Sequence, residues 1–549
     1  MRLQLKGASS GVGRVVARPG VLAMAVRGRA MLPNAPLLRC RPETAPRRMV
    51  DCRHGDLAVA DTAAAVVPSP TLYAGSKLYA GKKAVVIGAG PAGSTAAMYL
   101  ARDGFSVDVY ERRPEPDADS VDNGRAYIII LIPRGKAALE ELGIALPTDP
   151  HFLTQGTVRH SAKGKVSVNK EAGNVTWSRS DLAQFLINEA RKRYPDSISF
   201  HFEKDLASID LGAKVATVID TPPLPGTIGS GIAPSPPMQL PYDLLVGADG
   251  AASKVRAELQ TALPGFTVDV SDSGREYKVY LNLTGDIEPK EFKSNPGATL
   301  HLWSAKDDAF MSFTAHRNPD NTYSGTFSMR TGDHANVRSA AQYEEILRTR
   351  FAGVPEDWIP SIAAQASSKF ASPAGKRIRC STLAAPSALL LGDAAHAVTP
   401  VFGQGANSSL ESCRVLGDAL KESAGNVDAL PAKFDTLRRP DVHGLYEIDC
   451  KAFSFFSRKG PFDPDFLQLL AHVILGTILS KVVPFLYGDK PKLLKLGSAP
   501  YGEILSAIQR DATTAAWLAA GLLVGVLIKT WQFLMPKAVA LMKASAGAA

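Results

Sequence analysis

Three glycines at a fixed spacing give the clearest chemical signal in the sequence. Gly88, Gly90 and Gly93 form a GxGxxG pattern directly after the apolar run AVVI, and Glu111 follows about twenty residues later. Glycines there let the backbone turn tightly and let a pyrophosphate approach the N-terminus of the next helix. A carboxylate at Glu111 is placed to accept hydrogen bonds from an adenosine ribose, which favours NAD or FAD over a 2′-phosphorylated nucleotide. The pattern therefore predicts a dinucleotide site.

Two aspartates that follow apolar runs distinguish between these cofactors. Asp249 lies in GADG directly after LLV, and Asp393 follows LLLG. Gly403 and Gly405 come next, before a helix that we expect to begin near Asn407. A carboxylate at Asp393 can bond a ribityl hydroxyl, and the helix N-terminus offers free N–H groups to the pyrimidine edge of an isoalloxazine ring. These features favour FAD.

The elements that must hold these residues form a strand, helix, strand unit. The run before Gly88 predicts a strand, residues 91–102 a helix, and SVDVYE a second strand. The segment SRSDLAQFLINEARKRYP predicts an amphipathic helix with Ser180 as its cap. Alternating residues predict a strand over 156–168 and several antiparallel strands over 276–330. A sheet-based domain therefore interrupts the nucleotide fold.

These segments together resemble the single-component class A flavoprotein hydroxylases. The resemblance rests on the GxGxxG unit with Glu111, on GADGAASKVR at 247–256 and on GDAAHAVTPVFGQGANSSLESC at 392–413. Within this class the chain most resembles the kynurenine 3-monooxygenases. That closer likeness rests on GRAYIIILIPRG, HS at 160–161, SRSDL and RRPDVHGLYEID. The resemblance extends from about residue 82 to residue 535 and includes a C-terminal membrane segment.

The resemblance implies where FAD is bound. Asp249 is similar to a residue of the class that organises both FAD and the transient pyridine nucleotide, so its role is indirect. We expect no catalytic side chain, because the flavin carries the chemistry, and we interpret His396 as structural. The cofactor residues expected from the motifs and from the resemblance are Gly88, Gly90, Ala92, Gly93, Glu111, Arg112, Arg113, Arg179, Leu206, Asp249, Asp393, Gly405, Ala406 and Asn407.

The chemistry that the resemblance implies begins with hydride transfer from NADPH to FAD. Reduced flavin then captures molecular oxygen as a C4a-hydroperoxide, which hydroxylates an activated aromatic ring while the protein excludes water. Conversion of kynurenine to 3-hydroxykynurenine is the first expectation. Two alternatives stay open: a hydroxylase or epoxidase of an apolar polycyclic, quinone or isoprenoid substrate, and a membrane flavoprotein that does not hydroxylate.

The substrate residues depart from the kynurenine hydroxylases. Those enzymes hold the substrate carboxylate with an arginine, two tyrosines and an asparagine. Only the second tyrosine has a clear counterpart in this chain, which is Tyr487. The arginine position falls on Thr157, the asparagine position falls on Ala452, and residues 167–171 contain no tyrosine. Arg159 lies two residues from Thr157 and therefore on the same face of the expected strand. Arg159 and Tyr487 are our candidate substrate residues.

The expected fold is α/β, with a Rossmann-like FAD-binding domain interleaved with an antiparallel-sheet substrate domain. A helical C-terminal region and one C-terminal transmembrane helix follow. The expected segments are a transit-like leader (1–80), the first part of the FAD-binding domain with inserted strands (81–275), the substrate domain (276–370), the return of the FAD-binding domain (371–450), a helical cap (451–510), and a membrane anchor with its tail (511–549).

Two apolar stretches lie near the C-terminus. The run from Phe466 to Tyr487 is interrupted by polar residues and predicts a buried or cap helix. Residues 515–535 contain one charge, Lys529, with a tryptophan near each end, and predict a single transmembrane helix that binds the membrane. With the transit-like leader, this favours an organelle membrane, with the mitochondrial outer membrane first and a plastid as the alternative.

Charge and cysteine content exclude other classes. The formal net charge is +9, but the excess comes largely from arginines in residues 1–50, so we expect no nucleic-acid partner. The five cysteines are scattered and form no CxxC pair, so we expect no metal site and no redox dithiol. A protein of 549 residues has ample length for a large buried core. The resemblance implies a small aromatic substrate as its partner.

Overall fold

The computed structural model describes seven stretches of the chain. The leader up to residue 76 and the candidate substrate residue Tyr487 lie outside them. For residues 453–457 and 539–546 the structure describes the backbone alone. The described stretches are 77–116, 128–222, 235–295, 297–308, 310–457, 463–482 and 496–546.

A six-stranded sheet forms the centre of the FAD-binding half. Five of its strands run parallel and β19 pairs antiparallel with β20. Gly88, Asp249 and Asp393 follow the carboxyl ends of three adjacent strands, β1, β11 and β20, so they meet at one edge of the sheet. The strands in spatial order are β19 (Ala384–Ala385), β20 (Ala388–Leu390), β11 (Leu244–Gly247), β1 (Lys83–Ile87), β2 (Ser106–Tyr110) and β7 (Ile198–His201).

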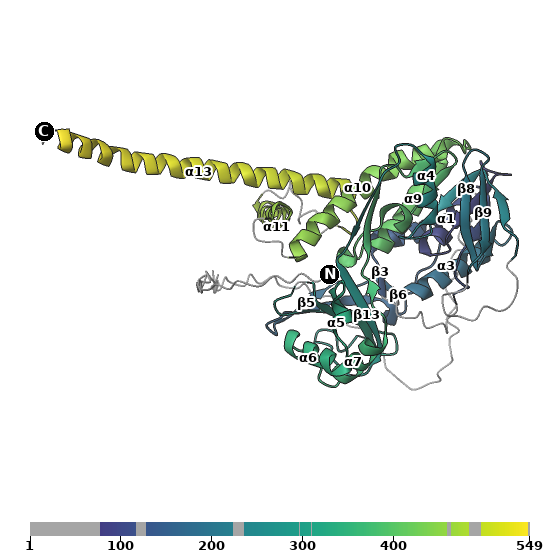
Figure 1. The fold of residues 1–549 in the computed structure, drawn as a ribbon, viewed down its shortest axis with the longest axis horizontal. Coiled ribbons are helices and arrows are strands. Elements are labelled where there is room, and N and C mark those ends of the chain that lie inside the picture. Colours follow the sequence, from purple (N-terminus) through teal and green to yellow (C-terminus); the bar gives the residue numbers. More distant parts are fainter. Residues whose placement is uncertain are drawn as a thin grey trace, which may run out of the picture. The chain divides into compact units, whose positions relative to one another are not determined.

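Helices cover this sheet, and α1 contacts both α9 and α3 (Figure 1). Gly417 of α9 allows a close approach to α1, because a Cβ there would lie 2.6 Å from the Tyr99 ring. The cap of α3 is Ser178, whose Oγ accepts from the Asp181 N–H at 3.1 Å, and not Ser180 as expected. The helix begins at Arg179, which places Ser180 inside its first turn. The helices of this half are α1 (Pro91–Arg102), α2 (Pro133–Glu141), α3 (Arg179–Arg193), α4 (Lys254–Ala262), α8 (Asp393–His396) and α9 (Gly405–Ser423).

A seven-stranded sheet forms the second half. Its neighbours pair antiparallel except β14 and β4, which run parallel. One face buries an aromatic core that includes Trp303, Phe313 and Tyr343, with α6 and α7 on that side (Figure 1). The strands in order are β17 (Ser372–Pro373), β13 (Arg275–Leu283), β16 (Tyr323–Arg330), β15 (Ser312–Arg317), β14 (Ala298–Ser304), β4 (Thr154–His160) and β5 (Val166–Lys170); the helices are α5 (Asp333–Asn336), α6 (Ala340–Arg350) and α7 (Ile359–Ser368).

Three smaller sheets complete the fold. The pair β3 and β6 lies beside the start of α3, and its β3 strand is hydrogen-bonded to α9. The strands are β3 (Ile128–Leu131) with β6 (Val175–Ser178), β8 (Lys204–Asp210) with β9 (Val215–Asp220) and β10 (Met238–Pro241), and β12 (Val268–Asp272) with β18 (Lys376–Cys380); the 3-10 turns are η1 (Pro150–Phe152) and η2 (Pro400–Phe402).

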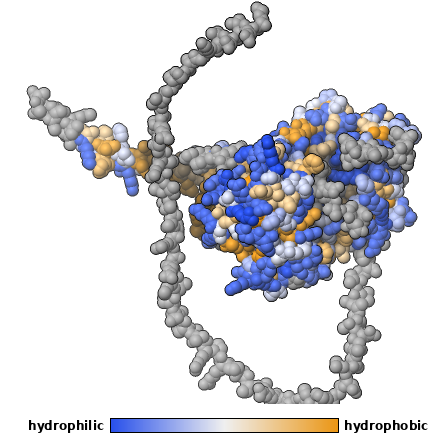
Figure 2. All heavy atoms as spheres, turned by 60° about the horizontal axis from the view of Figure 1, so that its bottom comes forward, coloured by the Kyte–Doolittle hydropathy of each residue, from blue (hydrophilic) through white to orange (hydrophobic). Residues whose placement is uncertain are grey.

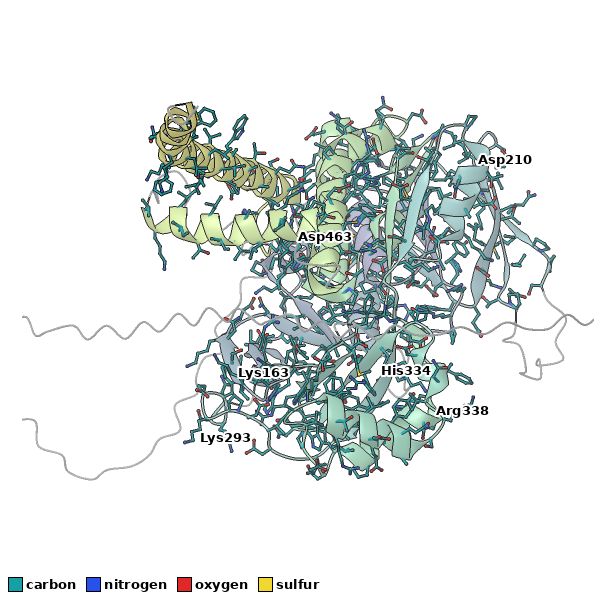
Figure 3. All side chains as sticks on the ribbon, turned by 60° about the vertical axis from the view of Figure 1, so that its left-hand side comes forward. Lys163, Asp210, Lys293, His334, Arg338 and Asp463 are labelled. Carbon is teal, nitrogen blue, oxygen red and sulfur yellow. The ribbon has the colours of Figure 1, made fainter. Side chains whose placement is uncertain are left out.

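The described part of the C-terminal region contains three helices: α10 (Leu430–Ser457), α11 (Pro464–Val482) and α13 (Tyr501–Ala546). Asp463 caps α11 by accepting from the N–H groups of Asp465 and Phe466 (Figure 3). Of the two expectations for the first apolar run, a buried helix or a cap helix, the first is wrong for α11, because its apolar side chains other than Leu469 are exposed or half-buried. Its buried residues are small or polar, with one leucine: Leu469, His472, Gly476 and Ser480.

Candidate active site

The glycine turn after β1 is tightly packed at two glycines and open at the third. Gly88 has φ +106°, and a Cβ there would lie 2.5 Å from the Ala248 carbonyl oxygen. A Cβ on Gly93 would lie 1.9 Å from the Gly88 carbonyl oxygen. Gly90, in contrast, has no atom within 4 Å of its Cβ position. The turn therefore leaves free space beside the N-terminus of α1, where a pyrophosphate fits.

Glu111 holds this turn from the end of β2. Its Oε2 accepts from the Ala89 N–H at 3.0 Å, and its Oε1 accepts from the Arg113 N–H at 3.0 Å. Each carboxylate oxygen has further lone pairs, so the side chain can still accept from a ribose hydroxyl. Arg112 and Arg113 are both exposed beside it.

Asp249 has one satisfied oxygen and one unsatisfied oxygen. Its Oδ2 accepts from the Lys254 N–H at 2.6 Å and the Val255 N–H at 3.2 Å at the start of α4. Its Oδ1 is buried and has no hydrogen-bond partner in the described part of the chain. Burial raises the pKa of this carboxyl group. A buried acceptor without a donor indicates that a further group belongs at this edge of the sheet.

Asp393 is a second acceptor without a donor. Within the described ranges no group donates a hydrogen bond to its carboxylate. Burial raises the pKa of Asp393, and the positive charge of Arg179 opposes that rise. A Cβ on Gly405 would lie 4.0 Å from Asp393 Oδ1, so the carboxylate lies beside the first residue of α9. An acceptor next to the free N–H groups of a helix start fits a ribityl chain and the pyrimidine edge of a flavin.

The Asn407 side chain is already engaged by the protein. Its Nδ2 donates to the carbonyl oxygens of Ile130 at 2.9 Å and Gly403 at 3.0 Å, and its Oδ1 accepts from the Ile132 N–H at 3.0 Å. The side chain therefore ties β3 to the start of α9. Only backbone groups of Asn407 and its neighbour Ala406 remain for a cofactor.

The other expected residues lie around this edge. Ala92 of α1 faces Gly392, since a Cβ on Gly392 would lie 3.0 Å from the Ala92 Cβ. Leu206 is buried, and its carbonyl oxygen accepts from Lys254 Nζ at 3.0 Å, which places it beside α4. His396 is buried with Nε2 2.9 Å from the Ser412 Oγ, and burial lowers its pKa to about 3. A neutral histidine held in this way acts as a packing residue.

The substrate sheet has an open face opposite its aromatic core. His160 stacks on Trp303 at 4.1 Å on the core side, so Thr157 and Arg159 point the other way. One row of paired residues on this open face contains Thr157, Leu300, His316 and Ser324, and the next contains Arg159, Leu302, Thr314 and Thr326. Arg159 is exposed and has no ion-pair partner among the residues that the structure describes.

A cavity of about 550 Å³ lies at the end of the first row. Its residues come from β3, the end of β6, the start of α3, the ends of β13 and β15, the start of β16 and the loop between β15 and β16. Burial lowers the pKa of His316 to about 4, so the imidazole is neutral at pH 7. The lining residues are Ile128, Ser178, Asp181, Leu281, Asn282, His316, Asn318, Pro319, Asp320 and Ser324.

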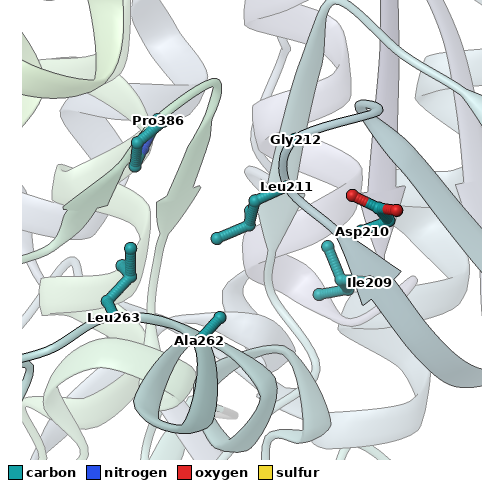
Figure 4. Close-up of a pocket in the computed structure, with 7 residues that line it drawn as sticks. All are labelled: Ile209, Asp210, Leu211, Gly212, Ala262, Leu263 and Pro386. Atoms are coloured by element: carbon teal, nitrogen blue, oxygen red, sulfur yellow. The ribbon is translucent and has the colours of Figure 1, made fainter.

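Sequence reasoning did not find these cavity residues. The strand SFTAHR could have predicted one of them, because the alternation of its side chains places His316 on the open face with Thr314. Asn282 has φ 57° at a register shift of β13, and no sequence pattern predicts that position. Arg159 does not line this cavity. A second cavity, of about 530 Å³, is lined by none of the expected site residues (Figure 4).

A family model described as FAD binding domain matches residues 82–430. The chain belongs to this family. It is an FAD-binding class A flavoprotein monooxygenase. A kynurenine 3-monooxygenase from Salinispora arenicola is 28% identical over 459 residues, which cover 81% of this chain and 94% of the relative. One from Drosophila willistoni is 30% identical over 356 residues, covering 62% of this chain and 72% of the relative.

Solved structures support the same fold for the monooxygenase. The tetrameric form of 2-methyl-3-hydroxypyridine-5-carboxylic acid oxygenase aligns with a TM-score of 0.52 at 21% identity, covering 71% of this chain and 96% of that one. PqsL, a probable FAD-dependent monooxygenase from Pseudomonas aeruginosa, aligns with a TM-score of 0.52 at 16% identity, covering 71% and 99%. At these identities the likeness establishes the fold alone.

The residues at the sheet edge fit the cofactor of this monooxygenase. Gly90 provides space, no described residue donates to Asp249 Oδ1 or to the Asp393 carboxylate, and the start of α9 supplies N–H groups. FAD supplies the redox and oxygen-transfer chemistry when bound. The protein is therefore an FAD-dependent aromatic monooxygenase. Its own residues must bind the cofactor, orient the substrate and exclude water from the site.

Proposed function

We propose that this monooxygenase hydroxylates a small aromatic substrate that carries a carboxylate, with kynurenine as the first candidate, NADPH as hydride donor and molecular oxygen as co-substrate. The kynurenine 3-monooxygenases among its relatives support the substrate class. The observation that carries the proposal is Arg159, an exposed cation on the open face without a described ion-pair partner. An arginine there can bind a carboxylate through two parallel hydrogen bonds.

The cofactor residues receive distinct roles in this proposal. The turn of Gly88, Gly90, Ala92 and Gly93 receives the pyrophosphate, and Glu111 accepts from the adenosine ribose. Arg112 and Arg113 add positive charge beside the phosphates. These roles agree with the free space at Gly90 and with the spare lone pairs of Glu111.

The flavin end of the cofactor has its own residues. Asp393, with Arg179 beside it, accepts from the ribityl chain, and the backbone N–H groups of Gly405, Ala406 and Asn407 face the pyrimidine edge. Asp249 acts indirectly by holding α4, and Leu206 packs beside that helix. Tyr487 stays a candidate substrate residue outside the described ranges.

NADPH oxidation by the purified, FAD-loaded protein tests this function. The rate is measured with and without L-kynurenine, while hydrogen peroxide and hydroxylated product are quantified. We expect kynurenine to stimulate NADPH oxidation and to yield 3-hydroxykynurenine, because a carboxylate has a cation to bind on the open face. Bound FAD without any stimulation would contradict the kynurenine assignment and leave the fold unaffected.

An apolar substrate is the second candidate, and two leucines next to the family's arginine position favour it. The family's arginine position is Thr157, and the neighbouring residues on β14 are Leu300 and Leu302. Such a face can pack a polycyclic, quinone or isoprenoid substrate by burial of apolar surface. Stimulation of NADPH oxidation by a carboxylate-free quinone, but not by kynurenine, would support this candidate.

We also propose that α11 and α13 embed in a membrane together. Every residue from 516 to 538 is exposed, and Trp517 and Trp531 are 75% and 65% exposed (Figure 2). The exposed side of α11 is apolar, while its buried side pairs His472 Nδ1 with Asp511 Oδ2 of α13 at 2.8 Å. Helices that bury polar and small residues and expose apolar ones are suited to lipid rather than water.

The mitochondrial outer membrane is the proposed location, with a plastid membrane as the alternative. The arginine-rich leader and the apolar C-terminal helices support an organelle. Imaging a fluorescent fusion that lacks residues 1–75 tests which signal is needed. Unchanged organelle targeting would show that the C-terminal helices are sufficient for targeting. Loss of targeting would show that the leader is required.

A further inference from the structure

The first turns of α13 are part of the folded core. Tyr501, Ile504 and Ile508 are fully buried, whereas the residues from 516 to 538 are exposed. We call Tyr501–Ile508 the foot of α13. Val398 and Phe402, which belong to the loop between Asp393 and α9, pack against the cluster that the foot forms with α10 and α11. The same helix therefore contacts the cofactor loop at one end and exposes apolar residues at the other.

A buried hydrogen bond connects the foot to the cofactor loop. The Tyr501 hydroxyl donates to Gln404 Oε1 at 2.8 Å, and Gln404 is 3% exposed. Gln404 directly precedes α9, and its carbonyl oxygen accepts from the Ser408 N–H at 2.8 Å. Its Nε2 donates to the Phe402 carbonyl oxygen at 2.9 Å. The Gln404 side chain is thus held between the loop and the foot.

Arg134 of α2 fixes the foot from the other side. Its guanidinium lies 3.8 Å from the centroid of the Tyr501 ring, and its Nε donates to the Leu496 carbonyl oxygen at 3.2 Å. It also forms an ion pair with Glu411 of α9. This places the Tyr501 ring against a cation that is itself tied to the helix bearing the cofactor N–H groups.

A second arginine completes the frame around the foot. Arg438 Nη1 lies 2.8 Å from Glu411 Oε2 and 3.0 Å from Asp441 Oδ2. Asp441 Oδ1 accepts from the Gly502 N–H at 3.0 Å, so α10 holds the residue after Tyr501. A buried network with charges on three helices resists displacement of any one of them.

We propose that Tyr501 is a positioning residue for FAD: it sets the conformation of the loop from Gly403 to Asn407, so that the C-terminal helix is a structural part of the cofactor site as well as a membrane segment. This inference rests on the proposed contact between the start of α9 and the flavin. Without the Tyr501 hydroxyl, Gln404 Oε1 is a buried acceptor with no donor. The loop then relaxes toward conformations that satisfy Gln404, and FAD binding must reverse that change.

Replacement of Tyr501 by phenylalanine in the full-length protein tests the proposal. Y501F keeps the ring under Arg134 and removes only the donor. We expect the FAD dissociation constant, measured by titrating the apoprotein, to rise about tenfold. The visible absorption band of the bound flavin should also shift, because the groups at its pyrimidine edge move. An unchanged dissociation constant with an unchanged band would overturn the proposal.

Tyr343→Phe is the matched control. Tyr343 is also fully buried, and its hydroxyl lies 3.0 Å from His334 Nδ1 on the core side of the substrate sheet, where Figure 3 labels His334. This variant should lower the thermal unfolding midpoint and leave the flavin band and the FAD dissociation constant unchanged. An equal effect of Y343F on FAD binding would reduce Tyr501 to a general stability residue and overturn the proposal.

A double-mutant cycle keeps the test informative if Y501F folds poorly. Q404M removes the acceptor while keeping side-chain length, and the double variant Y501F/Q404M leaves no polar group unpaired at this bond. We expect the two single changes in FAD affinity not to add. Additive effects would contradict a shared bond. If D393N weakens FAD binding but the cycle changes nothing, the inference fails and the proposed site stands; if neither changes FAD binding, the proposed site itself fails.

Discussion

The cofactor edge of the six-stranded sheet and the open face of the seven-stranded sheet differ in how well their residues fit the ligand expected at each. At the cofactor edge, Gly90 leaves space and Asp393 has no donor among the described residues, as a site for a large polar cofactor requires. On the open face, Thr157 stands at the expected arginine position beside apolar Leu300, and Arg159 is an exposed cation without an ion-pair partner among the described residues. Cofactor chemistry can thus be retained while substrate recognition changes, because different strands carry each.

Replacement of Asp393 should have the largest effect on the cofactor side. D393N removes a charged acceptor, so we expect the FAD dissociation constant to rise about 30-fold, the range of a hydrogen bond to a charged group. Apoprotein titration measures it. D210N, an exposed carboxylate of the same half (Figure 4), is the matched control and should bind FAD normally. Equal affinity of D393N and wild type would remove Asp393 from the site.

The same variant makes a pH-dependent prediction for the apoprotein. The pKa of Asp393 is higher in the folded chain than in the unfolded chain, so the charged form destabilises the fold at neutral pH. D393N should therefore raise the unfolding midpoint at pH 7, and the difference from wild type should vanish near pH 4, roughly the unfolded pKa. Unfolding followed by circular dichroism at several pH values checks this. A lower midpoint for D393N at pH 7 would contradict it.

Two glycines of the turn should separate folding from binding. G88A places a Cβ 2.5 Å from a carbonyl oxygen at a positive φ, so it should lower the unfolding midpoint of the apoprotein. G90A meets nothing within 4 Å, so it should leave the apoprotein stable and weaken FAD binding about tenfold by filling the free space. Calorimetry and FAD titration distinguish the two. Normal FAD affinity in G90A would mean that the space is not used.

The cation of the open face gives the next largest expected effect. R159Q should raise the KM for kynurenine about tenfold and leave the FAD dissociation constant unchanged, because only a carboxylate contact is lost. K163Q removes an exposed cation from the turn between β4 and β5, marked in Figure 3, and serves as the control. Equal KM values for R159Q and K163Q would contradict a carboxylate contact at Arg159 and favour an apolar aromatic substrate.

At neutral pH the smallest expected effect concerns His316 in the cavity. Burial lowers its pKa from 6.5 to about 4, so between these values the unfolded chain binds a proton that the folded chain does not. Stability should therefore fall as pH drops from 6.5 to 4, and H316N should reduce that slope by one proton. Denaturant titrations at several pH values measure it. An identical slope in H316N would show that His316 is protonated in the fold.

Local signals accounted for the cofactor edge. A strand, a glycine turn and a helix are specified within about twenty residues, so the sequence alone predicted β1, α1 and the strands that end before Asp249 and Asp393. Ser180 was a wrong cap because Ser178, two residues earlier, offers the same side chain and lies at the true helix start. Neighbouring serines give no local reason to prefer one over the other.

The features that the sequence did not predict depend on contacts between residues far apart in the chain. The bond from Tyr501 to Gln404 joins residues far apart in the chain, and His316 enters the cavity only through the pairing of four strands. The exposed apolar side of α11 was also missed, because an apolar helix looks the same in sequence whether it faces protein or lipid. These features depend on contacts with distant residues or with lipid, which no local sequence pattern predicts.

Turnover of L-kynurenine under isotopically labelled oxygen gas tests the central claim most directly. The product is isolated and its mass is measured, with bound FAD confirmed in the same preparation. We expect 3-hydroxykynurenine that carries one labelled oxygen atom, since a monooxygenase transfers one atom of molecular oxygen to the ring. Unlabelled product, or hydrogen peroxide with no hydroxylated product at all from an FAD-loaded protein, would contradict it.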